Sequence, residues 1–208
     1  NYNCKAIWGF PNNNSHYGFV KRLGWSNLSI LHTLGIDAKN ISPKGLSFKV
    51  DKIESFDENH SNFINGKIDS TVTVKRDKTY LNWRFIDKPN TNYHCYEFRS
   101  ETGKAILVIK FYPIGNDIFD LNVVECYMDN YEDIPDYLAY IINSFEEKIK
   151  RITIWKNLFD KNHLTLEKKG FVPVLPQTYI AARIHRSMPK LFSDFKNWHI
   201  SMSDSDVF

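Results

Sequence analysis

AIWGFPNNNSHYGFVKRLGW, residues 6–25, is the stretch from which the fold of this chain can first be inferred. Its apolar start predicts a short buried strand, and the Pro-Asn break after it predicts a tight polar corner. Ser15 is expected to cap a short helix, with Phe19 and Leu23 on its apolar face. Gly24 can adopt the left-handed conformation that ends a helix. The stretch therefore predicts a strand, a corner and a helix that packs back on the strand.

A second stretch repeats this order of features. Residues 153–171, TIWKNLFDKNHLTLEKKGF, again run from an Ile-Trp strand through an Asn-containing corner to a short helix. Both stretches end in glycine followed by an aromatic residue, Gly24-Trp25 and Gly170-Phe171. Because short-period solenoids repeat every roughly 20–50 residues, a repeat at this larger distance predicts a duplicated domain.

Composition indicates a folded protein with a packed core. Of 208 residues, 42% are hydrophobic and 15% are aromatic, which excludes a disordered chain. The formal net charge is only +3, with 27 basic and 24 acidic residues spread along the chain. We therefore expect neither nucleic acid nor a membrane surface as a partner. The longest apolar run is far too short to form a membrane span.

The cysteines and the first residues of the sequence bear on the cellular compartment in which we expect the protein. Cys4, Cys95 and Cys126 are odd in number and widely spaced. We expect reduced core thiols, with neither a disulfide framework nor a metal site. The first predicted strand follows within a few residues of Asn1, without a signal peptide. We therefore expect a cytoplasmic protein, of which these residues are the C-terminal portion.

The rest of the chain alternates predicted strands with a few helices. The clearest hairpin surrounds the Ser-Glu-Thr-Gly-Lys turn at 100–104. Asp133 and Pro135 open the best helix, whose apolar positions continue to Ile149. Because a strand precedes and follows that helix, the three elements form a crossover. Strands are expected at residues 28–36, 46–53, 93–98, 105–112, 118–127, 152–155, 172–175 and 179–184.

This order of elements resembles the GNAT acyltransferase fold. The family has a local pattern near its C-terminal end, N-x-x-[AS]-x-x-x-Y-x-K-x-G-[FW], which both repeats match in part. The first copy departs from it at His16 and Val20, where a small residue and a tyrosine are usual. The matching residues are Asn13, Arg22, Gly24 and Trp25 in the first copy and Leu166, Lys168, Gly170 and Phe171 in the second.

The form GFPN-x-x-S…LGW at residues 9–25 looks similar to GNAT relatives found among bacterial surface-polysaccharide genes. Trp-Arg-aromatic and a late Asp-x-Asp also occur there, matched here by residues 83–85 and 204–206. The resemblance implies an α+β or α/β fold, with a mixed, mostly antiparallel sheet flanked by helices. Residues 1–45 would end a first GNAT unit, residues 46–186 would form a complete second unit, and residues 187–208 would be a C-terminal tail.

The resemblance implies direct attack of a primary amine on acetyl-CoA, with a base and an acid to move protons. GNAT enzymes hold the CoA pyrophosphate on backbone N–H groups of a glycine-containing loop at the start of the long helix. Residues 126–136, CYMDNYEDIPD, match that place but contain no glycine and several acidic residues. We therefore expect this chain alone to bind no cofactor, and the upstream GNAT half of the full-length protein to bind acetyl-CoA or another acyl-CoA.

The first unit contributes candidate residues at its corner and helix. Asn12, Asn13 and Ser15 could line the pantetheine arm or the thioester of the acyl-CoA. His16 or Tyr17 could replace the family's missing tyrosine acid. The alternative is that all five residues only cap or cover the helix.

The second unit contributes a candidate base and a substrate site. Glu125 is late on the third antiparallel strand, where the family often has its base. Aromatic faces and a guanidinium suit a sugar or nucleotide, although the same residues could pack a helix on the sheet. The acidic pair near the C-terminus could instead be a solvated tail. The candidate substrate-binding residues are Trp83, Arg84, Tyr93, Asp204 and Asp206.

Three functions remain open from the sequence. The first is part of an acyl-CoA-dependent N-acyltransferase for a primary amine, by resemblance an amino-sugar or nucleotide-sugar of surface polysaccharide synthesis. The second is aminoacyl transfer of the Fem type, although no long helical arm or basic patch is visible. The third is a non-catalytic scaffold that binds a substrate or forms a homodimer, and the missing phosphate loop favours it.

Overall fold

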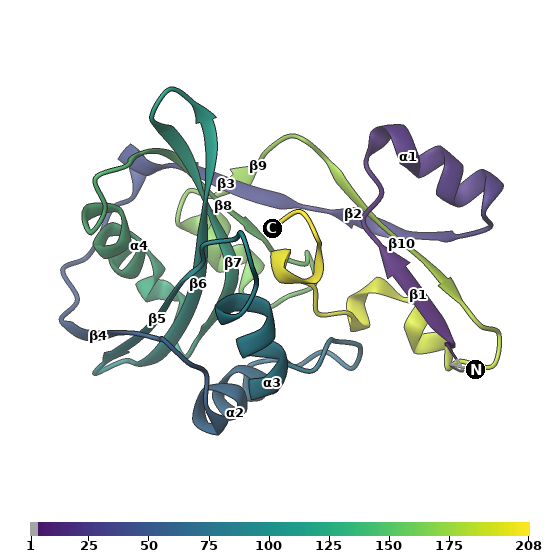
Figure 1. Cartoon of the computed structure of the whole chain (residues 1–208), viewed down its shortest axis with the longest axis horizontal. Helices are drawn as coiled ribbons and strands as arrows, with labels where there is room; N and C mark the ends of the chain where they lie inside the picture. Colours follow the sequence, from purple (N-terminus) through teal and green to yellow (C-terminus); the bar gives the residue numbers. More distant parts are fainter. Residues whose placement is uncertain (1–3) are drawn as a thin grey trace.

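The computed structural model describes residues 4–208, which form two β-sheets with helices around them (Figure 1). The strands are β1 (Ala6–Gly9), β2 (Ser26–Leu31), β3 (Thr33–Asp37), β4 (Phe48–Lys52), β5 (His94–Ser100), β6 (Gly103–Gly115), β7 (Ile118–Met128), β8 (Lys148–Trp155), β9 (Val172–Pro173) and β10 (Thr178–Ile184). The helices are α1 (Asn13–Tyr17), α2 (Glu58–Gly66), α3 (Lys78–Leu81), α4 (Ile134–Asn143) and α5 (His163–Lys168).

The larger sheet has seven strands in the order β4-β5-β6-β7-β8-β3-β9, and the smaller has three in the order β1-β10-β2. Neighbouring strands run antiparallel, except β7 and β8, which run parallel on either side of the crossover through α4. The expected mixed, mostly antiparallel sheet flanked by helices is therefore confirmed. Among the described helices, none is long and apolar enough to cross a bilayer.

Helices and tail cover both faces of the seven-stranded sheet. On one face, α4 presents Ile134, Leu138 and Ile141 to alternate residues of the central strands. On the other face, α2, α3 and the tail (residues 187–208) bury a second apolar cluster, in which Trp198 is one of the largest side chains. Because successive strand residues point to opposite faces, β6 and β7 contribute to both clusters. The long central strands thus organise the core.

The first repeat folds as a strand, corner and helix, with one change at the cap. Asn12, and not Ser15, is the N-cap of α1: its Oδ1 accepts from the backbone N–H of Asn14 and of Ser15, at 3.0 Å each. The Ser15 hydroxyl accepts from the Asn12 N–H at 3.1 Å, which completes a capping box. Gly24 has φ +66°, the left-handed conformation expected after the helix.

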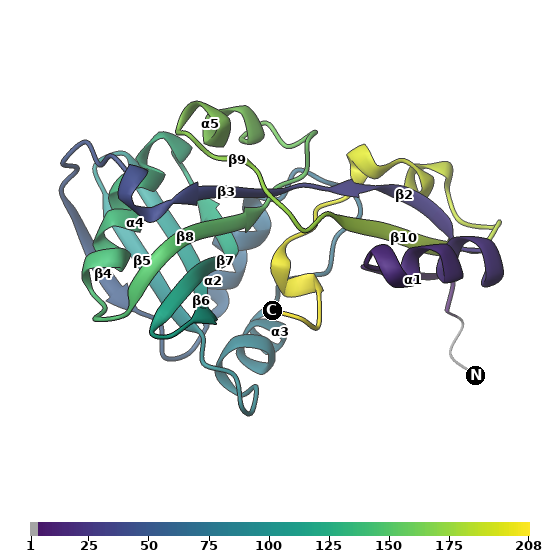
Figure 2. The same cartoon turned by 90° about the horizontal axis from the view of Figure 1, so that it is seen from above.

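The two repeats exchange their last strands. The series β1, α1, β2, β3 corresponds to β8, α5, β9, β10, but β3 pairs with β8 and β9 while β10 pairs with β1 and β2. The strand expected at residues 179–184 to close the second unit therefore belongs to the three-stranded sheet. Figure 2 shows β2 leading into β3 in an extended run from one sheet to the other. Strand pairing thus crosses the expected boundary at residue 45 in both directions.

Two smaller expectations need correction. The helix that follows Asp133 ends at Asn143, and Ile149 lies in β8, which must start early enough to pair in parallel with β7. All three cysteines are free, but only Cys95 and Cys126 are buried, whereas Cys4 is exposed. Burial raises the pKa of Cys95 to about 12 and that of Cys126 to about 11, so these two are core thiols as expected.

A substitution at Gly35 tests how tightly β3 is packed in the seven-stranded sheet. A Cβ at this residue would lie 2.9 Å from Val174 Cγ1 and 3.4 Å from Arg151 Cδ. We expect Gly35→Ala to lower the free energy of unfolding in urea by about 1–3 kcal/mol, because overpacking forces side chains apart. Adding Val174→Ala should restore much of the loss.

Gly115→Ala is the matched control, because no atom lies within 4 Å of a Cβ at that residue. Equal losses in Gly35→Ala and Gly115→Ala, or no recovery in the double variant, would show that β3 is not tightly packed here.

Candidate functional site

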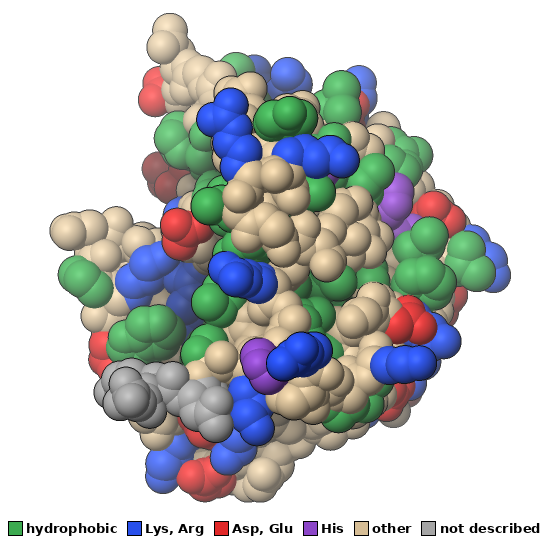
Figure 3. Space-filling model, turned by 90° about the vertical axis from the view of Figure 1, so that its right-hand side faces the viewer, with side chains coloured by type: hydrophobic (Ala, Val, Ile, Leu, Met, Phe, Trp, Pro, Cys, Tyr) green, Lys and Arg blue, Asp and Glu red, His purple; other side chains and the backbone are tan. Residues whose placement is uncertain are grey.

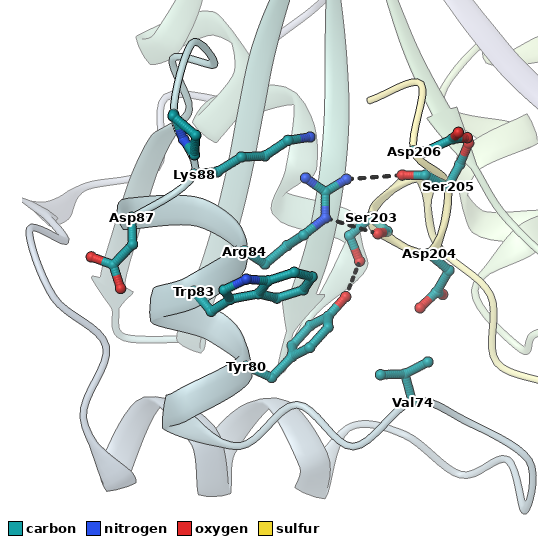
Figure 4. A pocket seen from close by; sticks show the side chains of 11 residues that line it. Val74, Tyr80, Trp83, Arg84, Asp87, Lys88, Ser203, Asp204, Ser205 and Asp206 are labelled. Atoms are coloured by element: carbon teal, nitrogen blue, oxygen red, sulfur yellow. Dashed lines mark hydrogen bonds between the residues drawn. The ribbon is translucent and has the colours of Figure 1, made fainter. Parts of the chain in front are cut away.

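A cavity of about 500 Å³ opens between the helical segment from Lys78 to Ile86 and the tail (Figure 4). We call it the Trp83 pocket. Four of the five candidate substrate-binding residues line it, although they are far apart in the sequence. The lining residues are Val74, Tyr80, Trp83, Arg84, Asp87, Lys88, Pro89, Ser203, Asp204, Ser205 and Asp206.

The wall of the Trp83 pocket is aromatic and its rim is charged. Trp83 is 63% exposed, and its ring centroid lies 6.0 Å from that of Tyr80. Asp87 and Asp206 are exposed carboxylates among the lining residues. An exposed aromatic face beside carboxylates can hold a cationic or hydroxyl-rich ligand, since the ring attracts cations and the carboxylates accept hydrogen bonds.

Arg84 and Tyr93 hold the tail in this structure. Arg84 Nε donates to the Ser203 carbonyl at 3.1 Å, and its Nη2 donates to the Ser205 carbonyl at 2.9 Å. Its Nη1 donates to the Tyr93 hydroxyl, which in turn donates to the Phe208 carbonyl at 2.6 Å. Arg84 is 5% exposed and Tyr93 is 7% exposed. Arg84 and Tyr93 therefore fix the position of the tail, which forms one wall of the pocket.

Beneath the pocket lies a fully buried arginine that sequence reasoning missed. Arg76 Nε donates to Glu125 Oε1 at 3.2 Å, and its Nη2 donates to Asp204 Oδ2 at 2.8 Å. Nη2 also donates to the Ser201 hydroxyl at 3.0 Å, and Nη1 donates to the Val74 carbonyl at 2.7 Å. Both carboxylate partners of Arg76 come from distant parts of the chain. For this reason no local sequence motif identifies Arg76 as part of a site.

One guanidinium thus faces two buried carboxylates. Glu125 Oε2 and Asp204 Oδ1 are buried and have no hydrogen-bond partner among the described residues. Burial raises the pKa of Asp204; the charge of Glu125 adds to this, while Arg76 opposes it. Burial and the same two carboxylates also raise the pKa of Tyr80 to about 12. The Asp204 side chain therefore holds a proton more firmly than an ordinary aspartate does.

Glu125 lies at a β-bulge of β7, where Val124 is the extra residue between the pairs Val108–Glu125 and Ile109–Val123. Its side chain is 1% exposed, and the Ser203 hydroxyl of the tail donates to its Oε1. Because the tail covers it, Glu125 cannot take a proton from a bound amine in this arrangement.

The tail also enters the gap where β7 and β8 separate. Their pairing ends at Val123 and Ile154, and residues 199–201 lie beyond, around a remaining space of only about 10 Å³. His199 Nε2 is 3.1 Å from the Tyr127 hydroxyl. Burial lowers the pKa of His199 well below its usual value, and Arg76 and Lys156 lower it further. The neutral imidazole of His199 thus helps to fill the gap between β7 and β8.

The start of α4 does not fit a pyrophosphate. Asp136 Oδ1 accepts three backbone N–H groups, from Lys44, Gly45 and Leu46, at 2.8–3.0 Å. Asp133 Oδ2 accepts from the Thr102 hydroxyl at 2.5 Å and from Asn130 Nδ2 at 3.0 Å. These two carboxylates are buried at the start of the helix and would repel an anion there. The residues at this helix therefore do not form a CoA site.

The candidate residues of the first repeat lie apart from the Trp83 pocket, on α1 beside the three-stranded sheet (Figure 1). Asn12 and Ser15 form the capping box, and Asn13 is exposed. His16 stacks on Tyr179 at 4.0 Å between ring centroids, with its Nε2 3.1 Å from Asn27 Oδ1. Figure 3 views this end of the molecule, where basic and hydrophobic side chains are interspersed. The remaining candidate, Tyr17, is 63% exposed on α1.

Comparison with known proteins finds similarity at the level of structure. No family model matches the sequence, and no curated protein matches it significantly. A GCN5-related N-acetyltransferase from Anabaena variabilis ATCC 29413 aligns with a TM-score of 0.61 at 11% identity, over 86% of this chain and 46% of that one. A conserved protein of unknown function from Enterococcus faecalis V583 gives 0.57 at 13% identity, over 86% and 45%.

A tandem GNAT protein from the clavulanic acid biosynthesis pathway aligns with a TM-score of 0.53 at 9% identity, over 86% of this chain and 64% of that one. At such identities the likeness shows the fold alone, which is that of the GNAT N-acetyltransferases. This chain spans about half the length of the first two structures and less than two thirds of the third.

Replacing Arg76 tests the buried charges. Arg76→Met keeps much of the side-chain volume but leaves Glu125 and Asp204 buried without their cation. We expect the free energy of unfolding to fall by about 3–5 kcal/mol at pH 7. Lys161→Met is the control, since its Nζ lies 2.6 Å from Asp69 Oδ2 in an exposed ion pair, and it should cost less than about 1 kcal/mol. Similar losses in urea unfolding would contradict the assigned role of Arg76.

Asp204 predicts a specific pH dependence. Its pKa is raised above the ordinary 3.8, so the folded chain binds this proton more tightly than the unfolded chain does. Its contribution to the free energy of unfolding is therefore greatest at low pH and falls as the pH rises from about 4 through the raised pKa. Asp204→Asn should remove this part of the dependence. Urea unfolding of both chains from about pH 4 to 7 measures it, and parallel curves would disprove it.

Proposed function

We propose that this chain is the C-terminal portion of an acyl-CoA-dependent N-acyltransferase with two GNAT units, and that the Trp83 pocket holds the primary amine acceptor. The observation that supports this most is a buried carboxylate, Asp204, which lines a cavity walled by an exposed indole and has an oxygen without a partner among the described residues. The GNAT fold of the structural neighbours supports the reaction class.

The chemistry of the pocket favours a cationic, hydroxyl-bearing acceptor. An ammonium over the face of Trp83 gains cation–π attraction, and the carboxylates of Asp87 and Asp206 add favourable charge. Hydroxyl groups of a sugar ring can donate to the same carboxylates. An amino-sugar or nucleotide-sugar amine is therefore the substrate class that we propose, in keeping with the likeness of residues 83–85 and 204–206 to polysaccharide-cluster relatives.

The acyl-CoA would bind to the other GNAT unit. In this proposal residues 1–45 end the first unit and residues 46–186 form the second, with the last strand of each lying in the sheet of the other. The acidic start of α4 supports this division, since the buried carboxylates of Asp133 and Asp136 would repel a pyrophosphate. On α1, the exposed Asn13 and Tyr17 remain free to contact an acyl-CoA, whereas His16 is held by stacking.

A binding module without catalysis is the second candidate function. The tail covers Glu125 and fills the gap between β7 and β8, so the seven-stranded unit offers a ligand pocket without an accessible base. In that case the Trp83 pocket would still bind an amine, but the complete protein would not transfer an acyl group to it.

Substitution of Trp83 tests the proposal. In the complete protein, Trp83→Ala should raise the KM for an amino-sugar acceptor about tenfold, because the cation–π and stacking contacts are lost. The KM for acetyl-CoA should not change, since in this proposal residues of the other GNAT unit bind the acyl-CoA. Trp83→Phe should retain much of the wild-type KM. Initial rates of acetyl transfer to a panel of amino-sugars and nucleotide-linked amino-sugars provide the measurement.

Phe159→Ala is a matched control, because Phe159 is an aromatic residue with 62% exposure outside the Trp83 pocket. An unchanged acceptor KM in Trp83→Ala would exclude this pocket as the acceptor site. Binding of the amine that Trp83→Ala weakens, without turnover by the complete protein, would exclude the acyltransferase and support the binding module.

A further inference from the structure

A second cavity, of about 220 Å³, lies where the two sheets meet and shares no lining residue with the Trp83 pocket. We call it the Asp120 pocket. Its floor is a polar patch on β7 and β8. Its walls are Tyr112, Trp155, the connection from β9 to β10, and the end of the tail, including Phe208. The site is independent of the function proposed above, because it uses other residues.

The floor consists of two cross-strand pairs that are two positions apart in the β7–β8 register and therefore on the same face, Asp120 with Arg151 and Asn122 with Thr153. The Thr153 hydroxyl donates to Asn122 Oδ1 at 2.6 Å. Asp120, Asn122 and Thr153 are each 5% exposed. Polar residues buried side by side on a sheet face are costly unless their hydrogen bonds are satisfied, so each atom needs an identified partner.

Asp120 Oδ1, a buried atom of the floor, has no hydrogen-bond partner among the described residues. Arg151 donates twice to Asp120 Oδ2, from Nε at 3.1 Å and from Nη2 at 2.5 Å. Asp120 Oδ1 is buried and accepts no hydrogen bond from any described residue. An unpaired buried acceptor is unfavourable, and Asp120 lines the cavity. A donor that reached the oxygen from this cavity would satisfy it.

The walls indicate which kind of donor fits. The rings of Trp155 and Phe208 meet edge to face, with centroids 5.1 Å apart, and Tyr112 adds a half-exposed third ring. Leu175, 79% exposed, also lines the cavity and marks its opening. Aromatic faces around a carboxylate oxygen favour an ammonium group, which donates to the carboxylate and is attracted by the rings. The cavity has the volume of roughly seven water molecules, so the ligand must be small.

We propose that the Asp120 pocket is a second ligand site, which binds a small organic ammonium compound. Its N–H donates to Asp120 Oδ1, and its apolar body contacts Trp155 and Phe208. Arg151 orients the carboxylate from the opposite oxygen. A ligand of this kind would explain why polar residues of β7 and β8 are buried beneath aromatic side chains.

Titration with benzylammonium tests the site in this chain. The indole N–H of Trp155, which donates to Thr33 Oγ1 at 3.0 Å, provides a local nuclear magnetic resonance signal. We expect this signal to shift saturably, and benzyl alcohol to bind at least tenfold more weakly. Equal binding of the alcohol would overturn the ammonium class. A shift confined to the Trp83 signal, or none, would overturn the site.

Variants identify the residues. Asp120→Asn should raise the Kd for benzylammonium at least tenfold, whereas Asp51→Asn, the same change in an exposed carboxylate that pairs with Arg99, should leave it unchanged. Tyr112→Ala removes a half-exposed ring and should raise the Kd about threefold even if Asp120→Asn does not fold. An unchanged Kd in Tyr112→Ala, or in a folded Asp120→Asn, would refute the proposal.

Discussion

The bonds of one buried guanidinium determine where the end of the chain lies. Arg76, in the segment between α2 and α3, binds Glu125 of β7 and both Ser201 and Asp204 of the tail. Because removing a buried charge from its partner is very costly, these bonds hold the tail against the sheet. From the next helical segment, Arg84 donates to three tail carbonyls, those of Ser203, Ser205 and Phe208. The position of the tail then decides which surfaces of the sheet remain accessible.

The tail separates two cavities of different character. Residues 203–206 line the Trp83 pocket, whereas Met202, Val207 and Phe208 line the Asp120 pocket. Between them the tail covers Glu125 and fills the gap between β7 and β8. The tail thus lies between two cavities of a GNAT fold and fills the gap between its strands β7 and β8. This arrangement explains how the unit could bind small molecules without an accessible base or a phosphate loop.

Much of the local structure could be predicted from the sequence, since it depends on neighbouring residues. The hairpin at 100–104, the start of α4 after Asp133 and the left-handed Gly24 all follow from backbone preferences. The site was predicted less completely. Of the five residues assigned to substrate binding, Trp83, Arg84, Asp204 and Asp206 line one cavity and Tyr93 does not; their binding of a substrate stays a prediction. Arg76 and Asp120 could not be found, because a lone charged residue shows no partner until the chain is folded.

The sequence by itself determined the order of most strands and helices, several of the turns, and the duplication of the strand–helix–strand pattern. Only the tertiary structure decided which strands pair, since an alternating strand such as β10 could complete either sheet. Its pairing with β1 and β2 depends on how the two repeats lie side by side. The tertiary structure likewise decided that Glu125 is covered and Asp120 Oδ1 unpaired. Burial and hydrogen bonding are properties of neighbours in space, which residue order does not contain.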